Sequence, residues 1–245
     1  EESEALSARA QVAFERGDTA EGMRLFDAAV AADPNDALAV YQRGVAQAKQ
    51  KRGAEAAADF EKALALRPDL DAAALELGIL RVEEGRPEEA EPLLHQAERN
   101  PALAGQANFF LGIARLRQDD LGGARAAFEK ARAADPKLEP TCRYYLGVVE
   151  YRLGNAGAAR EHFVLVREMA PQTAVGRESS AFLELLEASQ GTGTQVYGSL
   201  SLQYDSNVVL APAEGLPGPA ISDQADGRVA INVGGVYEAW RNDWA

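Results

Sequence analysis

Small and bulky apolar residues recur along this chain at a spacing of 34 residues, which lengthens to 35 only at the last step. Each period has two positions held by Gly or Ala, and a bulky apolar residue follows the second. The first small position holds Gly44, Gly78, Gly112 and Gly147, the second Gly22, Ala56, Ala90, Ala124 and Ala159, and the bulky one Phe26, Phe60, Leu94, Phe128 and Phe163. This period predicts pairs of antiparallel helices that must stack on one another to bury their apolar faces.

Each period contains two helical segments, a tight turn between them and a proline after the second. In the third period, residues 71–84 have apolar positions at helical spacing, 85–87 form the turn and 88–99 form the second helix. Proline ends each second helix because it has no amide hydrogen to donate. Residues 1–173 therefore predict an all-α solenoid of five helix-turn-helix repeats.

These positions resemble the small, small, aromatic, Ala and Pro sites of the tetratricopeptide repeat family, in five consecutive units. Ala10 departs from the first small Gly, and Lys51 from a turn Gly. The resemblance implies a right-handed superhelix. We expect the small residues to let the two helices of a pair approach closely, and the bulky residues to fill the seam between pairs.

Residues 174–190 predict one further amphipathic helix, in which Phe182, Leu183, Leu185 and Leu186 lie beside charged side chains. The sequence offers this helix no partner helix. We expect it to cap the last open face of the solenoid.

Residues 191–245 predict a β-hairpin, because from Gln195 the side-chain period changes from helical to two. A first strand of about ten residues is followed by a Pro- and Gly-rich loop over 206–226 and a second alternating run over 228–240. Strands of this length with one apolar face match those of a transmembrane β-barrel, which needs further strands to close.

The run from Tyr204 to Leu210 resembles the entry to outer-membrane barrels that carry periplasmic tetratricopeptide domains. Surface lipoprotein assembly modifiers and exopolysaccharide-export porins have that architecture. The resemblance implies that residues 1–245 are the periplasmic part and the first barrel strands of a longer Gram-negative secretion or export protein. Two alternatives stay open: a soluble hairpin docked on the last repeat, and a tail that is disordered or pairs with another chain.

The charge argues against nucleic acid as a partner. The net charge of −13 divides into −9 for residues 1–190, with 23 basic and 32 acidic residues, and −4 for 191–245, with 2 and 6. An acidic surface repels phosphate backbones and anionic lipid headgroups. Cys142 is the single cysteine, so the chain forms no internal disulfide, and the count fits either redox compartment.

Candidate chemistry is sparse, and we predict a protein that is not an enzyme and has no catalytic, cofactor or metal site. His95 and His162 are 67 residues apart and neither has a second ligand at metal spacing. The chain contains no Gly-x-Ser-x-Gly elbow and no Gly-rich phosphate loop with its lysine.

A protein-binding groove is the function that the repeat resemblance implies, on the first helix of each pair. The expected groove residues are Phe14, Tyr41, Val45, Leu75, Ile79, Val82, Phe109, Ile113, Leu116, Tyr144, Val148 and Tyr151, with Lys49, Arg117 and Arg152 on its rim. Such a trough suits an apolar or amphipathic segment of a protein partner, with Tyr41, Phe109 and Tyr144 as energetic hot spots. The alternative is that several of these side chains pack helix against helix.

The resulting hypothesis is a periplasmic scaffold without enzymatic activity, joined to an outer-membrane β-barrel through its C-terminal strands, which guides a client at the barrel mouth. An exopolysaccharide-export porin with a repeat domain is one alternative. A cytoplasmic adapter with no membrane tie is another. The start at Glu1 without Met fits a mature exported protein after removal of a signal peptide, or a recombinant start.

Overall fold

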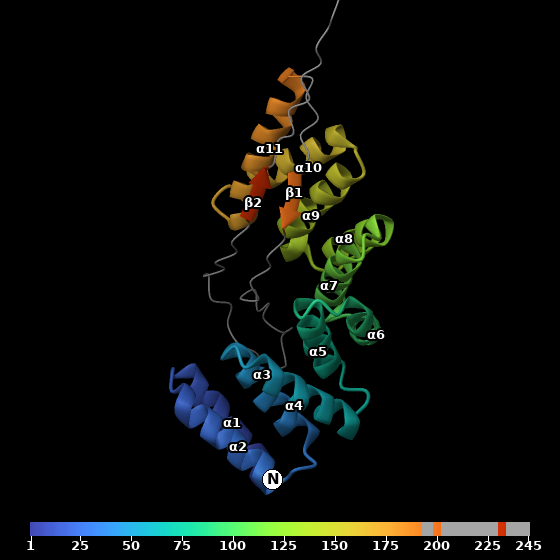
Figure 1. Cartoon of the computed structure of the whole chain (residues 1–245). Helices are drawn as coiled ribbons and strands as arrows, with labels where there is room; N and C mark the ends of the chain where they lie inside the picture. The colour runs from blue at the N-terminus through green and yellow to red at the C-terminus, as the bar shows by residue number, and fades with distance from the viewer. Residues whose placement is uncertain (193–197, 202–229, 234–245) are drawn as a thin grey trace, which may run out of the picture. The chain divides into compact units, whose positions relative to one another are not determined.

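The computed structural model describes residues 1–192, 198–201 and 230–233 (Figure 1). The predicted loop over 206–226 and the outer parts of both predicted strands lie outside these residues. The described helices fall into two compact units, one from Glu1 to Cys142 and the other beginning at Arg143. The α-helices are α1 (Glu2–Glu15), α2 (Thr19–Ala32), α3 (Ala37–Lys49), α4 (Gly53–Leu66), α5 (Asp71–Glu83), α6 (Pro87–Glu98), α7 (Ala104–Arg117), α8 (Leu121–Ala134), α9 (Glu139–Arg152), α10 (Ala156–Met169) and α11 (Ala174–Thr192).

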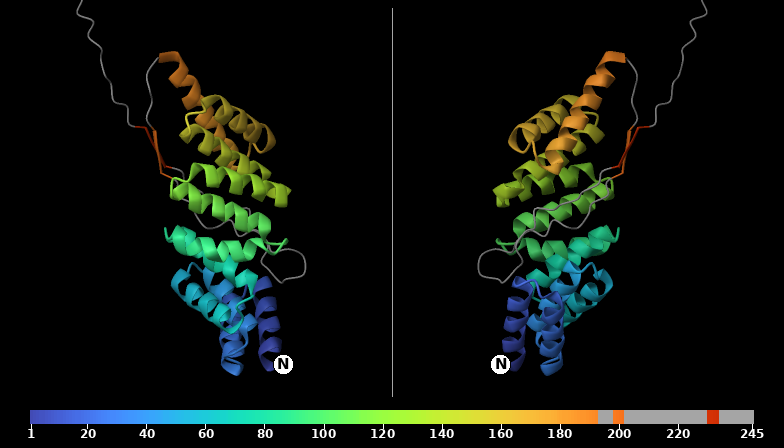
Figure 2. Two further views of the ribbon diagram at one scale, coloured as in Figure 1. Left: turned by 90° about the vertical axis from the view of Figure 1, so that its right-hand side faces the viewer. Right: turned by 90° about the vertical axis from the view of Figure 1, so that its left-hand side faces the viewer.

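The helices alternate as the period predicts, with an A helix (odd numbers) followed by its B helix (even numbers) from α1 to α10. In the first unit, α1 packs on α2, α3 on α4, α5 on α6 and α7 on α8 (Figure 2). Successive pairs also contact each other, since α2 meets α3, α4 meets α5 and α6 meets α7. The predicted all-α helical-repeat fold is confirmed.

Local chemistry sets the ends of the helices. The Asp18 and Asp120 carboxylates cap α2 and α8 by accepting the amide hydrogens of Glu21 and Gly123, at 3.0 and 2.9 Å. The turn inside each pair contains a residue with a positive φ angle, in the left-handed region of backbone conformation. At Lys51 the φ angle is 60°, at the position where the sequence departs from a turn Gly.

Each first-position glycine lies against the bulky residue of its own repeat. A Cβ added to Gly44 would lie 2.8 Å from a Phe60 ring atom, and one added to Gly112 would lie 2.5 Å from Phe128. The bulky residue therefore closes the contact between the A and B helices of one pair, whereas the sequence predicted that it fills the seam between pairs. Phe60 serves both contacts, because it also packs in a buried cluster with Leu77 of the next pair.

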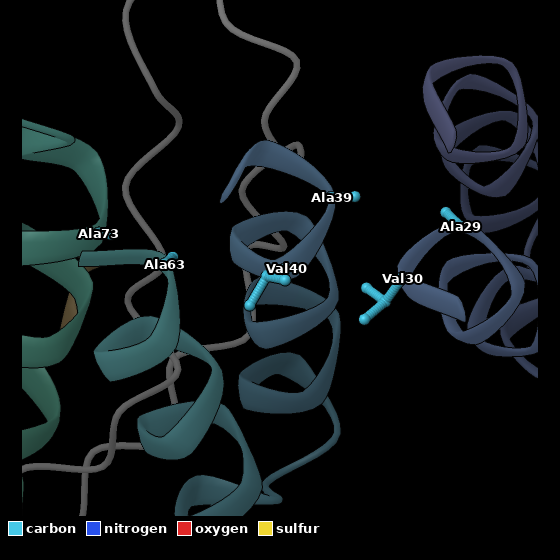
Figure 3. Packing of buried hydrophobic residues seen from close by; sticks show 6 residues of the cluster. All are labelled: Ala29, Val30, Ala39, Val40, Ala63 and Ala73. Carbon is cyan, nitrogen blue, oxygen red and sulfur yellow. The ribbon is translucent and has the colours of Figure 1, made fainter. Parts of the chain in front are cut away.

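Small side chains fill much of the seam between neighbouring pairs in the first unit. Ala29 and Val30 of α2 face Ala39 and Val40 of α3, in a cluster that also contains Ala63 and Ala73 (Figure 3). Ala29 and Val40 are completely buried. Small residues on both sides let the backbones of α2 and α3 approach closely here, and the partly buried Tyr41 packs against this cluster.

Helix α11 packs on α10 in the second unit. The Phe182 ring stacks on Phe163 with centroids 4.7 Å apart and an interplanar angle of 9°, and it lies 6.0 Å from the ring of Tyr151. The helix continues through Gly191 to Thr192, two residues beyond the predicted end at 190. A glycine in a helix costs about 1 kcal/mol relative to Ala, which disfavours the last turn without forbidding it.

Two short strands are described beyond α11. β1 (Gly198–Ser201) pairs antiparallel with β2 (Ala230–Val233), with Gly198 opposite Val233 and Ser201 opposite Ala230. Both strands lie inside the two alternating runs of the sequence. The barrel remains a prediction, because four residues in each strand do not define one.

Candidate partner-binding surface

The predicted groove residues divide into a buried set and a half-buried set. Seven are at most 4% exposed: Leu75, Val82, Phe109, Ile113, Leu116, Tyr144 and Val148. Five are half-buried: Phe14, Tyr41, Val45, Ile79 and Tyr151. The three rim cations Lys49, Arg117 and Arg152 are exposed.

The buried set packs one helix against another. The Phe109 ring lies 5.3 Å from Phe110 and 5.8 Å from Phe128, and the Tyr144 ring lies 5.9 Å from Phe163. Side chains 3% and 2% exposed offer almost no surface to a partner, so the hot-spot expectation for Phe109 and Tyr144 does not fit their burial. Tyr41 is still predicted to be a hot spot, because its side chain is half-buried and its ring packs on Phe60 with centroids 5.9 Å apart.

One face of α3 carries a continuous row of accessible side chains. Leu38, Gln42, Val45 and Lys49 follow one another at steps of four, three and four residues, which places them on one side of the helix. We call these four residues the α3 row. Leu38 is 40% exposed, and Val45 is half-buried against the Phe60 cluster. The row therefore combines accessible apolar surface with a rigid base.

Lys49 of this row and the neighbouring Tyr41 both interact electrostatically with Glu76 of α5. Burial raises the pKa of the Glu76 carboxyl to about 7, although the positive charge of Lys49 opposes the shift. Loss of water around the Lys49 ammonium lowers its pKa, while the charge of Glu76 acts in the opposite direction. Burial and, secondarily, the charge of Glu76 raise the pKa of Tyr41. Glu76 is thus part of this surface, which the sequence did not indicate because its burial depends on neighbouring helices.

Three features of the described residues bear on metal binding, membrane insertion and thiol reactivity. They contain no cluster of three or more His, Cys, Asp and Glu side chains that could hold a metal ion. No helix among them is both long and apolar enough to cross a membrane. Burial raises the pKa of the Cys142 thiol to about 12, so the reactive thiolate is scarce at neutral pH.

Stacked helical pairs that share one Gly–Phe or Gly–Leu contact, with an accessible row on an A helix, define an α-solenoid repeat protein. A family model described as tetratricopeptide repeat matches residues 7–71 and 75–139, and a second such model matches residues 47–102. The chain belongs to the tetratricopeptide repeat family.

One curated relative is the tetratricopeptide repeat and J domain-containing co-chaperone DNJ1 of Fusarium oxysporum f. sp. lycopersici. It is 38% identical over 80 residues. The match covers 33% of this chain and 15% of the relative, so the chain spans a small part of that protein's length.

Solved structures share the fold at low sequence identity. MamA 41-end from Desulfovibrio magneticus RS-1 is 25% identical with a TM-score of 0.64, over 71% of this chain and 98% of that one. YrrB, described as a TPR protein with an unusual peptide-binding site, is 22% identical with a TM-score of 0.62, over 72% and 90%. PilW, a type IV pilus biogenesis factor, is 20% identical with a TM-score of 0.60, over 75% and 92%.

Proposed function

We propose that this chain is a scaffold without enzymatic activity that binds a segment of a partner protein on the A helices of its first unit. The observation that carries the proposal is the α3 row with Tyr41 beside it, an accessible apolar surface supported by a packed core. Half-buried Ile79 occupies on α5 the repeat position that Val45 occupies on α3. The peptide-binding site named for the similar YrrB supports the same kind of ligand.

The bound segment is apolar or amphipathic. Tyr41, Val45 and Ile79 supply apolar contact, and aromatic side chains on a rigid base dominate binding energies at interfaces. Lys49 and Glu76 place two ionisable groups at the edge of this surface, and such groups fix the orientation of a bound segment more than its affinity.

Photo-crosslinking in cells tests the proposal for a partner of any identity. A photoreactive phenylalanine analogue at Val45 or Ile79 should yield a discrete adduct with another protein. The matched controls carry the analogue at Ala54 and Ala58, exposed positions on the B helix α4, and should yield none. Equal adducts from all four positions, or none from Val45 and Ile79 in a folded protein, would overturn the assignment.

We further propose that the scaffold is periplasmic and that residues from 193 onward lead into an outer-membrane barrel, where the bound client is guided to the barrel mouth. The alternating sequence over 195–205 and 228–240 supports this proposal. An exopolysaccharide-export porin and a soluble adapter are the alternatives.

Fractionation of the full-length gene product separates these possibilities. A barrel protein sediments with membranes, needs detergent for extraction and changes its electrophoretic mobility on heating. A full-length protein that remains in buffer would contradict the barrel and favour the adapter.

A further inference from the structure

An acidic cavity lies between the N-terminal parts of α1 and α3, with the α2–α3 turn as its third side. Its volume is about 690 Å³, within the roughly 300–1,000 Å³ typical of ligand pockets. None of its described lining residues is Lys or Arg, whereas Glu4, Asp33 and Asp36 contribute carboxylates. The cavity therefore repels anions.

Two lining side chains contain buried oxygen atoms without a hydrogen-bond partner among the described residues. Ser7 of α1 is 5% exposed, and its Oγ has no partner. Gln42 of the α3 row has an unpartnered Oε1. An unsatisfied buried polar atom costs about 1 to 3 kcal/mol, and a ligand that donates hydrogen bonds would remove this cost.

Asp36 is held in place at the cavity wall. Its Oδ1 accepts the amide hydrogens of Leu38 and Ala39 at 3.0 and 3.2 Å, and its Oδ2 accepts the Ser3 hydroxyl at 2.8 Å. Leu38 itself lines the cavity and is 40% exposed. The site thus places an apolar wall next to fixed acceptors and negative charge, which suits an aliphatic stem with a cationic end.

We infer that this cavity binds the cationic head of an arginine or lysine side chain from the partner segment. The inference rests on the proposed function, because Leu38 and Gln42 belong to both the cavity and the α3 row. A guanidinium supplies several donors in a fixed geometry and is more weakly hydrated than an ammonium, so arginine is the better ligand. The first unit therefore selects a segment with a basic residue beside its apolar part.

Fluorescence anisotropy with two peptides tests the inference on the full chain. The probe is a nine-residue peptide of Leu, Ala and Ser with one central arginine, and its control has citrulline, which keeps the shape and removes the charge. The arginine peptide should bind about tenfold more tightly or better, the factor expected for hydrogen bonds to a charged group. Spermidine, a cation without a peptide backbone, should compete weakly.

Ser7→Ala should weaken binding of the arginine peptide about threefold to tenfold and leave the thermal midpoint unchanged or higher, because it removes an unpaired hydroxyl. Ser179→Ala is the matched control, since Ser179 is also buried, has no hydrogen-bond partner among the described residues, and lies in α11, outside the cavity lining. It should change the affinity for neither peptide. Asp36→Asn retains a helix-capping side chain and should lower the affinity for the arginine peptide about tenfold.

The outcomes separate this inference from the proposed function. If both peptides bind equally and Val45→Lys abolishes binding, the α3 row binds a partner and the cation site is refuted. If neither peptide binds, both assignments fail. If spermidine competes as well as the arginine peptide, the cavity takes free polyamines and the assignment to a partner side chain is overturned.

Discussion

Replacing Gly112 by alanine tests the contact that closes each helical pair. The substitution adds a single methyl group to α7, at a position where the nearest Phe128 ring atoms lie 2.5, 2.7 and 2.8 Å from the new carbon. Phe128 is completely buried, so its ring cannot turn away without displacing other core residues. The methyl group therefore forces α7 and α8 apart.

Two opposing effects set the magnitude. Overpacking a tight core costs about 1 to 3 kcal/mol, and contacts this short favour the upper end. Alanine gains about 1 kcal/mol over glycine in a helix interior. We expect Gly112→Ala to lower the free energy of unfolding by about 2 kcal/mol. In a Phe128→Ala background the same change should instead stabilise by about 1 kcal/mol, because the ring that it strikes is absent.

Urea unfolding followed by far-UV circular dichroism measures these differences. Gly122→Ala on α8 is the control, because an added Cβ there finds only one atom within 4 Å, Asp120 Oδ1 at 3.9 Å. It should leave the midpoint unchanged or raise it slightly. Equal midpoints for Gly112→Ala and Gly122→Ala would refute the steric argument, as would additivity of Gly112→Ala and Phe128→Ala.

Three further substitutions give distinct signatures. The pKa of Glu76 is raised from 4.5 to about 7, so its contribution to stability is present below about pH 4.5 and is lost as the pH rises through 7. Glu76→Gln should therefore raise the free energy of unfolding by about 2 to 3 kcal/mol at pH 8 and leave it unchanged at pH 4, which urea titrations at both pH values measure. Arg43→Ala should lower the free energy of unfolding by about 3 kcal/mol, because it leaves the buried Asp59 carboxylate without its charge partner. Asp59 is 6% exposed and accepts two hydrogen bonds of 2.7 Å from Arg43. As a control, Arg24→Ala removes an exposed ion pair and should leave the urea midpoint unchanged. Lys51→Gly should raise the thermal midpoint by an amount equivalent to about 1 kcal/mol, since φ is 60° there; a lower midpoint would contradict this.

The repeat fold could be predicted from the sequence because its defining contact joins residue types that are rare together. A glycine inside a helix is unfavourable alone, so its return every 34 residues in phase with a bulky residue indicates a close approach of two helices. The prolines between pairs supplied the boundaries. The assignment of Phe60 to the seam was incomplete, because periodicity shows which residues are buried and not which neighbour buries them.

The binding surface could be predicted only in part. Residues such as Phe109 and Tyr41 occupy equivalent repeat positions, yet Phe109 is buried and Tyr41 is half-buried. The difference depends on the side chains of adjacent pairs, which vary between repeats. The cavity was not predicted because Ser7 and Gln42 are 35 residues apart and meet only when the first two pairs stack.

The contact between a first-position glycine and the Phe or Leu of its own pair has a consequence for how this chain tolerates change in length. The 35-residue step adds its extra residue between Ala131 and Gly147, a stretch that contains the short 3-10 helix over Pro136–Leu138. The turns between pairs accept such an insertion. A residue inserted inside a helix would instead rotate every later side chain of that helix by about 100° and move the glycine away from the ring that it contacts. Duplication or deletion of a whole helical pair leaves each contact between glycine and Phe or Leu intact, so the number of pairs can change in steps of one repeat.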